Sequence, residues 1–528
     1  MAQTDADTTE TGGTAKAGSA RLSGVAGFTS GRLAATLGAL IIAVLFATLD
    51  TTIVATALPT IAGELDAFES FAWVGAAYVV TAAISTPILG KLSDLYGRRT
   101  IFQSTMGVFF VGSLLCGIAQ TMPQLIAARA VQGVGGGAIQ ALAFAILGDI
   151  LSPRDRGRYI GYFTMAFAAA ALLGPLVGGF IIERWDWHWI FLINLPLIAI
   201  AALATHFTLK LPFTRRSASI DWLGAGMLCL GLGGLMIALE VGKDGWGEPP
   251  VVVGLVGGCA VLVLFVWWER RVDEPMIPMR LFANKTVLGT AVMGLFIGSV
   301  SYGAFQFMPL FFQDSQFVSP TNSGLRMMPV MFGVVVMSTM CGRLISRTGR
   351  YKIFPIAGFA GVLLGLFAVS RITADTSYTM LAIPFAVIGL GSGAIYTTTS
   401  IAAQNACELR DLGVTTATIM FFRNLGGSLA LAGYGALLNS YTRSTLPERT
   451  GLAADDAVAL LRTPEDIESL AAGMRTAVVD TISDGVGLIQ LVSALTMFVG
   501  LYYAVRLPEL PLRNVAGITE AMQETAGH

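Results

Sequence analysis

The sequence Gly90-Lys91-Leu92-Ser93-Asp94-Leu95-Tyr96-Gly97-Arg98-Arg99 is a charged, glycine-punctuated turn between two long apolar runs. A weaker copy, Gly342-Arg343-Leu344-Ile345-Ser346-Arg347-Thr348-Gly349-Arg350, follows 252 residues later (90 to 342). A second pair, 133–139 and 389–395, repeats at an offset of 256 (133 to 389). Two segments that recur in the same order indicate two homologous halves of one membrane fold. A charged turn repeated between membrane helices points to a transporter.

The composition excludes an ordinary soluble domain, because 54% of the residues are hydrophobic and only 13% are charged. Apolar runs of about 20 residues are long enough to cross a hydrocarbon core of roughly 30 Å. Fourteen such runs predict an all-α membrane protein. They lie near 33–56, 72–90, 100–119, 124–147, 158–182, 189–209, 221–240, 250–268, 286–312, 324–345, 352–371, 379–402, 411–438 and 485–505.

The charged residues predict the orientation in the membrane. Cations gather in the even-numbered connections, as at Lys91, Arg98 and Arg99, whereas residues 59–71 contain three carboxylates and no Lys or Arg. By the positive-inside rule, both termini are expected in the cytoplasm. The expected location is the plasma membrane. Residues 1–32 are poor in apolar side chains and are expected to form a disordered tail. The first apolar run is too long for a cleaved signal peptide.

Several motifs resemble those of a known family. Gly90–Arg99 resembles motif A of the major facilitator superfamily, and Leu49–Pro59 resembles the first-helix signature of its fourteen-helix drug/proton antiporter family. Arg129–Gly136 is similar to motif B, and Trp187–Pro196 to the start of the sixth helix, although His188 stands where Arg is commoner. The matches cover roughly residues 35–510.

The antiporter motif, motif C, is matched by Gly174, Pro175, Gly178 and Gly179. One departure is Ala170, which replaces the usual glycine, but a small residue still permits close helix packing. In the resembled family this motif marks exporters. The plainer interpretation is a kinked, closely packed helix.

The repeat offset explains the number of helices. Six-helix halves are expected to recur after about 180 residues, so an offset of 252 to 256 leaves room for two extra helices. The major facilitator fold implied here is therefore six plus two plus six helices. The expected parts are a tail at 1–32, a first half at 33–209, two inserted helices at 210–285, a second half at 286–505 and a tail at 506–528. Within the second half, residues 439–484 are expected to form an extracytoplasmic amphipathic loop with one or two short helices. This loop is expected to cap the protein, and docking of a partner is the alternative.

The two charged turns are predicted to form a conformational latch. Glycines permit a tight turn, while the carboxylate and the cations bind helix ends, carbonyls or lipid phosphates. The alternative is an ordinary basic loop, but the spacing and its return in the second half favour the latch. Its residues are Gly90, Asp94, Gly97, Arg98, Gly342, Arg343, Gly349 and Arg350.

Asp50 and Arg129 are the candidate proton-coupling residues, because both lie inside predicted membrane helices. A carboxylate at a helix centre costs about 3 kcal/mol on insertion scales. Burial favours the protonated form of Asp50, and the approach of Arg129 or water favours the carboxylate. A structural hydrogen bond between helices is the alternative role.

The substrate cavity is expected between the two halves at the middle of the membrane. Aromatic side chains offer a broad apolar surface, and a few polar groups orient the ligand. Packing toward lipid explains any single aromatic residue equally well. The candidates are Gln132, Gln140, Tyr302, Phe305, Gln306, Tyr396 and Arg423.

These observations predict a proton-coupled antiporter that exports amphipathic, drug-like compounds by alternating access. The alternatives are a dedicated exporter of one endogenous lipid, siderophore or antibiotic, and a non-transporting sensor or channel. We expect a monomer that contacts protons and membrane lipids and binds no nucleic acid. An enzyme is not expected, since the Gly-x-Gly run at 133–137 lies inside a predicted membrane helix without a preceding strand. The five scattered cysteines predict no disulfide, metal or cofactor.

Overall fold

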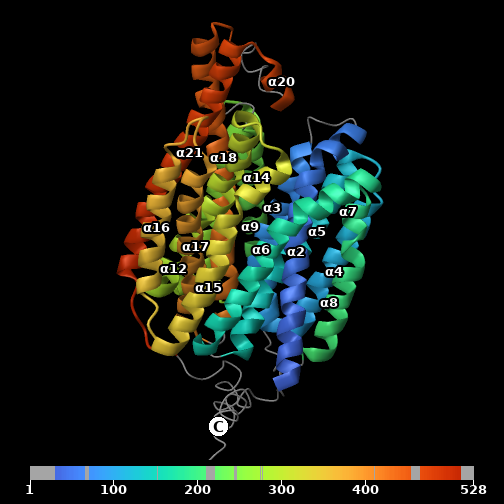
Figure 1. The fold of residues 1–528 in the computed structure, drawn as a ribbon. Helices are drawn as coiled ribbons and strands as arrows, with labels where there is room; N and C mark the ends of the chain where they lie inside the picture. Colours follow the sequence, from blue (N-terminus) through green and yellow to red (C-terminus); the bar gives the residue numbers. More distant parts are fainter. Residues whose placement is uncertain are drawn as a thin grey trace, which may run out of the picture.

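The computed structural model describes residues 30–65, 71–151, 153–209, 221–242, 247–273, 275, 277–408, 411–453 and 464–512. Throughout these ranges the chain is helical and contains no strand (Figure 1). The predicted tails lie largely outside the described residues, which begin at Ser30 and end at Leu512.

The first part of the chain forms one group of long helices and a helical hairpin. The group consists of α2 (Ser30–Glu64), α3 (Phe71–Tyr96), α4 (Arg98–Gly117), α5 (Met122–Ile150), α6 (Pro153–Arg184), α7 (Trp189–Leu192) and α8 (Asn194–Thr208). The hairpin consists of α9 (Trp222–Val241) and α10 (Pro249–Glu269).

The remaining chain forms a second group of helices. These are α11 (Arg280–Ala283), α12 (Lys285–Gly298), α14 (Pro320–Arg326), α15 (Met328–Thr348), α16 (Ile353–Val369), α17 (Tyr378–Ala406), α18 (Leu412–Thr450), α20 (Pro464–Ser469) and α21 (Ala472–Arg506).

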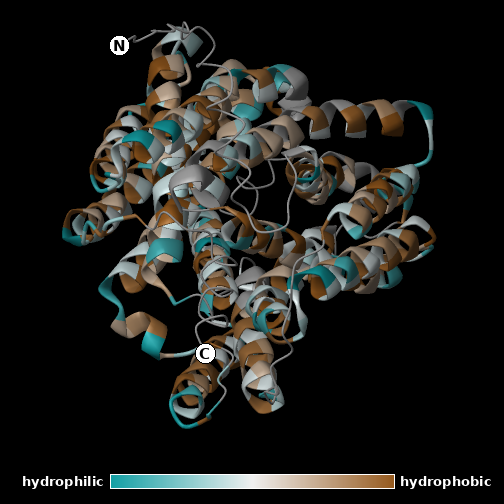
Figure 2. Ribbon diagram, turned by 90° about the horizontal axis from the view of Figure 1, so that it is seen from below, coloured by the Kyte–Doolittle hydropathy of each residue, from teal (hydrophilic) through white to brown (hydrophobic). Residues whose placement is uncertain are grey.

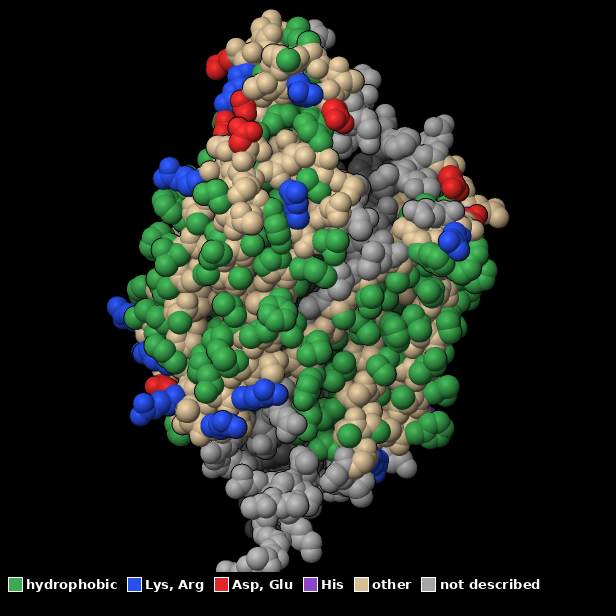
Figure 3. All heavy atoms as spheres, in the orientation of Figure 1, with side chains coloured by type: hydrophobic (Ala, Val, Ile, Leu, Met, Phe, Trp, Pro, Cys, Tyr) green, Lys and Arg blue, Asp and Glu red, His purple; other side chains and the backbone are tan. Residues whose placement is uncertain are grey.

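An apolar belt surrounds the bundle. Large hydrophobic side chains are strongly exposed on it, among them Phe207, Leu230 and Val253 at 69%, 72% and 70%. Figure 3 shows hydrophobic side chains over the middle of the visible face, with charged side chains mostly toward its upper and lower ends. Viewed from below, most helices run nearly along the line of sight (Figure 2). A soluble protein would not expose so much apolar surface, so the chain is a multi-pass membrane protein.

Among the described residues, ten helices are long and apolar enough to span a membrane. Two shorter apolar helices lie at Trp222–Leu235 and Ile353–Val369. Helical residues also coincide with each of the fourteen apolar runs. The all-α prediction is therefore confirmed, while fourteen crossings and the six-plus-two-plus-six arrangement stay predictions.

The two groups of helices meet along closely packed pairs. Between α6 and α15, a side chain at Gly161 would lie only 2.5 Å from the Thr339 hydroxyl. Between α3 and α18, a Cβ at Gly90 would lie 2.5 Å from the Cβ of Ala417. The α9–α10 hairpin covers α3 and α18 from the side, where Leu228 packs in a cluster with Phe421.

The segment after α12 is an irregular helix, unlike the regular helix that the apolar run 286–312 suggests. It passes through a π-helix (Ser299–Gly303), a 3-10 turn (Ala304–Phe307), α13 (Met308–Leu310) and a second π-helix (Phe311–Ser315). Pro309 contributes to this, because it has no N–H for the carbonyl four residues earlier. Interrupted membrane helices of this kind line binding sites in transporters.

The connection 439–484 is more helical than the sequence suggests. Helix α18 continues to Thr450 and α21 already begins at Ala472. The 39 residues of α18 measure about 58 Å, well beyond a hydrocarbon core of about 30 Å. The pair therefore projects from the top of the bundle as drawn in Figure 1. Arg449 and Asp484 join the two helices by an ion pair of 2.7 Å. Of the expected amphipathic helices, α20 is present, and 454–463 lies outside the described residues.

Candidate functional site

A buried polar network surrounds Asp50 in the first half. Asp50 is 0% exposed on α2, and Arg129 Nη1 on α5 donates to its Oδ2 at 2.7 Å. Gln132 Nε2 and Asn194 Nδ2 both donate to the other oxygen, Oδ1, at 2.8 and 2.7 Å. The carboxylate thus receives donors from two further helices, α5 and α8, which explains how a charge is accommodated at this depth.

Arg129 is equally well enclosed, at 2% exposure. Its guanidinium lies 4.3 Å from the centre of the Tyr78 ring and 5.8 Å from that of Phe191. Its Nε donates to the carbonyl oxygen of Val74 at 3.4 Å. The cation is therefore held between a carboxylate and two aromatic faces, an arrangement that stabilises charge without water.

Gln132 belongs to this network, and its assignment to the substrate cavity stays a prediction. Its side chain is 0% exposed, accepts from Arg129 Nη1 at 2.6 Å and donates to Ser113 Oγ at 2.7 Å. The Cys116 thiol approaches its Oε1 at 3.7 Å. Every polar atom of Gln132 is turned inward, so the side chain couples α4 to α5.

Asn194 is a member of the network that sequence reasoning missed as a site residue. Its Nδ2 binds Asp50, while its Oδ1 is buried without a partner among the described residues. The turn before it is held by His188, whose Nε2 lies 2.9 Å from the Ala119 carbonyl oxygen. The backbone N–H of His188 also donates to Asp186, which holds the pKa of that carboxyl below its usual value. The turn therefore fixes where α8 begins and where Asn194 points.

A second charged network joins α3 to the start of α18. Arg98 Nη1 lies 2.5 Å from Asp94 Oδ1, and Arg98 Nε donates to Asp149 Oδ2 at 2.7 Å. Arg98 also donates to Ser93 Oγ. The backbone N–H of Val414 donates to Asp94 Oδ2 at 3.0 Å, so the carboxylate caps the N-terminus of α18. This contact bridges the two halves. Asp149 was missed by the sequence analysis.

The copy of this turn in the second half keeps a glycine with positive φ, but its arginines form no ion pair with a described residue. Gly97 and Gly349 both have positive φ, 95° and 73°, which favours glycine at each turn. Ser346 stands at the position that matches Asp94, and Arg343 and Arg350 are exposed. The charged network that joins α3 to α18 is therefore built from the first copy of the turn. In the second copy, Gly342 is buried in α15.

Gly174 of the antiporter motif allows α6 to touch α2. A Cβ at Gly174 would overlap the Thr52 hydroxyl, and Thr52 Oγ1 donates to the Ala170 carbonyl oxygen at 3.0 Å. Gly178 is buried, and a Cβ at Gly179 would meet nothing within 4 Å. The side chain of Pro175 lies outside the described residues. Thr52 lies two residues from Asp50, so motif C packs beside the polar network.

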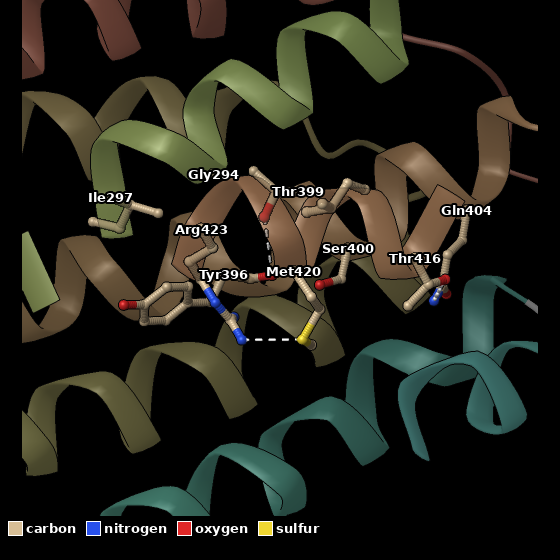
Figure 4. A pocket seen from close by; sticks show the side chains of 10 residues that line it. Gly294, Ile297, Tyr396, Thr399, Ser400, Gln404, Thr416, Met420 and Arg423 are labelled. Atoms are coloured by element: carbon tan, nitrogen blue, oxygen red, sulfur yellow. Dashed lines mark hydrogen bonds between the residues drawn. The ribbon is translucent and has the colours of Figure 1, made fainter. Parts of the chain in front are cut away.

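A small cavity of about 10 Å³, lined by both polar and apolar side chains, lies in the second half, between α12, α17 and α18 (Figure 4). That is room for about one water molecule. Tyr396 and Arg423 both line it, whereas their place in a substrate cavity between the two halves stays a prediction. Tyr396 also hydrogen bonds to Ser301 in the first π-helix, which ties the irregular helix to α17. The lining residues are Gly294, Ile297, Tyr396, Thr399, Ser400, Gln404, Thr416, Ile419, Met420 and Arg423.

The other cavity candidates are dispersed. Gln140 on α5 donates weakly to Thr48 at 3.4 Å. Phe305 packs against Phe385 with ring centres 6.3 Å apart. Gln306 is exposed, and the side chain of Tyr302 lies outside the described residues. The structure therefore brings two of the seven candidates into one cavity and places a third, Gln132, in the Asp50 network.

No group of three potential metal ligands occurs within the described ranges. All five cysteines are free thiols. What the geometry provides is two charged networks, one buried beside α2 and one between the halves, together with a small cavity.

Comparison with known sequences identifies the family. A model described as Major Facilitator Superfamily matches residues 40–431. An uncharacterized MFS-type transporter of Mycobacterium tuberculosis (strain ATCC 25618 / H37Rv) is 34% identical over 484 residues, covering 90% of this chain and 70% of the relative. Multidrug resistance protein 3 of Bacillus subtilis (strain 168) is 32% identical, covering 84% and 87%. Efflux pump dotC of Dothistroma septosporum (strain NZE10 / CBS 128990) is 31% identical, covering 91% and 85%.

Solved structures agree on the fold. The human organic anion transporter MFSD10 (TETRAN) superposes with a TM-score of 0.59 at 14% identity, covering 88% of this chain and 99% of that one. The proton:xylose symporter XylE superposes with a TM-score of 0.56 at 13% identity, covering 94% and 100%. Likeness at this identity concerns the fold alone. Together with the sequence relatives, it shows that the chain is a transporter belonging to the major facilitator superfamily.

Proposed function

We propose that this protein is a proton-coupled antiporter of the fourteen-helix drug/proton family that exports amphipathic, drug-like compounds. The observation that carries the proposal is the fully buried Asp50 with Arg129, Gln132 and Asn194 bound to its two oxygens. A carboxylate at this depth is costly, and it can change its charge by taking up a proton. The names of the relatives, a multidrug resistance protein and an efflux pump, support export.

The proton acts through the hydrogen bonds that it changes. As a carboxylate, Asp50 only accepts, and it holds α2 to α5 and α8. A proton on Asp50 removes the charge that binds Arg129 and converts one oxygen into a donor. The contacts of α2 with α5 and α8 then weaken. Because Thr52 on the same helix touches Ala170, this change reaches α6 and the antiporter motif.

The latch between α3 and α18 provides the alternating step. In this conformation Asp94 caps the N-terminus of α18, which keeps the two halves together at the end of the bundle where α18 begins. Opening that end requires this contact to break, while the Arg98–Asp149 pair can stay within the first half. The motion assigned to the transporter is a rocking of one half against the other about a central substrate site.

The driving force is sufficient for useful export. One charge that moves down a potential of about 150 mV yields about 3.5 kcal/mol. That supports a gradient of roughly 300-fold when one proton exchanges for a neutral compound. The proposal places the protein in the plasma membrane as a monomer with both termini in the cytoplasm.

The test is uptake of amphipathic dyes into inverted membrane vesicles under an imposed pH gradient. The wild type should accumulate dye and release it when the gradient is collapsed, and Asp50→Asn should bind dye without accumulating it. Asp480→Asn, an exposed carboxylate on the projecting hairpin, serves as the matched control and should behave as wild type. Accumulation by Asp50→Asn equal to that of the control refutes the proton site. A deletion strain that retains one metabolite and shows no wider drug sensitivity indicates a dedicated exporter instead.

A further inference from the structure

Arg423 is an arginine in the middle of a membrane helix. It lies 11 positions after the start of α18 at Leu412, which corresponds to about 16 Å along the axis and half of a 30 Å core. Its backbone is fixed by α12, because a Cβ at Gly298 would overlap the Arg423 carbonyl oxygen. The cation is therefore held at one depth, beside the irregular helix.

The side chain of Arg423 has different partners from those of Arg98 and Arg129. Arg98 and Arg129 each bind a carboxylate at 2.7 Å. Among the described residues, Arg423 makes no ion pair, and its side chain forms one hydrogen bond, to Met420 Sδ at 3.2 Å (Figure 4). It also lies 5.2 Å from the centre of the Tyr396 ring. A thioether is a weak acceptor for one of five N–H donors, so most of the hydrogen-bonding capacity is left for a ligand.

The cavity beside Arg423 is suited to an anion. None of its ten lining residues is acidic. The hydroxyl of Ser400 faces the same cavity and forms no hydrogen bond with a described residue. The hydroxyls of Thr399 and Thr416 are already donated to backbone carbonyls. The hydroxyl of Ser400 and the remaining N–H groups of the Arg423 guanidinium are therefore left without an acceptor among the described residues.

We infer that Arg423 and Ser400 bind the acidic group of the substrate, so that the protein transports amphipathic anions such as long-chain carboxylates. The inference rests on the proposed export function and names its substrate class. The acidic group replaces the Met420 sulfur at the guanidinium, and the flexible methionine and the Tyr396 ring cover the adjoining apolar chain. An inside-negative membrane potential itself favours the outward movement of an anion.

Binding to purified protein in zwitterionic nanodiscs tests the inference without requiring transport. The probes are dansyl-labelled undecanoic acid, its primary amide and the amine of equal chain length, with empty nanodiscs subtracted. Wild type should bind the acid about tenfold or more tightly than the amide, and the amine most weakly. Arg423→Gln should bind acid and amide alike, and Arg423→Lys should keep part of the preference. Ser400→Ala should reduce the preference by a smaller factor.

Arg371→Gln, an exposed arginine at the end of α16, is the matched control and should leave the preference unchanged. All variants are compared by gel filtration and thermal midpoint, so that a misfolded protein is recognised; Arg423→Lys tests the charge if Arg423→Gln fails to fold. A wild-type protein that binds the amine best, binds none of the probes, or keeps its acid preference in Arg423→Gln overturns the inference. If the inference alone is wrong, wild-type protein should still accumulate dye in the proton-driven vesicle assay. Loss of that accumulation would instead mean that the proposed function is wrong.

Discussion

At the scale of single residues, the surroundings of Asp50 were predicted only in part from the sequence. A carboxylate and an arginine inside two predicted membrane helices suggested a pair, and the structure places Asp50 and Arg129 2.7 Å apart. Their role in coupling stays a prediction. Asn194 and Ser113 were not foreseen, because one polar residue in an apolar run has many packing explanations. Asn194 and Ser113 are recognised as network residues only from their hydrogen bonds to residues on other helices, which a single sequence does not reveal.

The residue-scale prediction concerns Arg129 and its counterpart in the second half. The repeat matches Arg129 with Phe385, which is fully buried and packs edge-on to Phe305 and Phe312. Arg129→Ala should abolish pH-driven dye uptake, because Asp50 loses its cationic partner, whereas Arg129→Lys should retain a fraction. Phe385→Ala should lower the melting temperature and alter dye affinity while the uptake still needs a proton gradient, since it removes packing only. Equal loss of coupling in folded Arg129→Ala and Phe385→Ala proteins would show that coupling is shared by both halves.

At the scale of helices, the position of each apolar run was predictable and its detailed shape was not. Length and hydropathy indicate a helix over 286–312, but the π-turns there depend on contacts with α17 and α18. The sequence likewise placed the end of α18 at 438, although the helix continues to Thr450. Beyond the hydrocarbon core, hydropathy no longer marks a helix, and the pairing of Arg449 with Asp484 stabilises the extension.

The element-scale prediction uses the close contact of α3 with α18. Because a Cβ at Gly90 would lie 2.5 Å from that of Ala417, Gly90→Ala should force the helices apart and slow transport. The double variant Gly90→Ala with Ala417→Gly should recover most of the activity, since it moves one methyl group across the same contact. The measurement is the initial rate of dye uptake by equal amounts of folded protein. A double variant as slow as the single one would mean that this contact does not limit the cycle.

At the scale of the whole molecule, the two halves share a backbone plan and differ in charge. Positive-φ glycines punctuate both turns, yet the carboxylates of the latch and of the buried network occur in the first half. The repeat could be recognised from glycines and arginines alone. The difference in charge between the halves could be suspected from Phe385, which stands where the first half has Arg129. The hydrogen bond from Val414 to Asp94 joins residues 320 positions apart in the sequence, so it could be found only from the folded structure.

The whole-molecule prediction concerns orientation. In a variant without native cysteines, Cys introduced by Arg350→Cys should react with an impermeant maleimide only in inverted vesicles, because Arg350 lies in a connection rich in Lys and Arg, which the positive-inside rule assigns to the cytoplasm. Cys introduced by Asp480→Cys, near the ion-paired hairpin, should react only in intact cells. Labelling of both positions from the same side contradicts the assigned topology.

Proton release on substrate binding tests the central claim most directly. Purified protein in weakly buffered detergent solution is mixed with an amphipathic substrate, and the pH is followed with an indicator dye. The account predicts release of protons by wild type, none by Asp50→Asn despite retained binding, and wild-type release by the Asp480→Asn control. Substrate binding that releases the same number of protons from Asp50→Asn as from wild type would contradict the account.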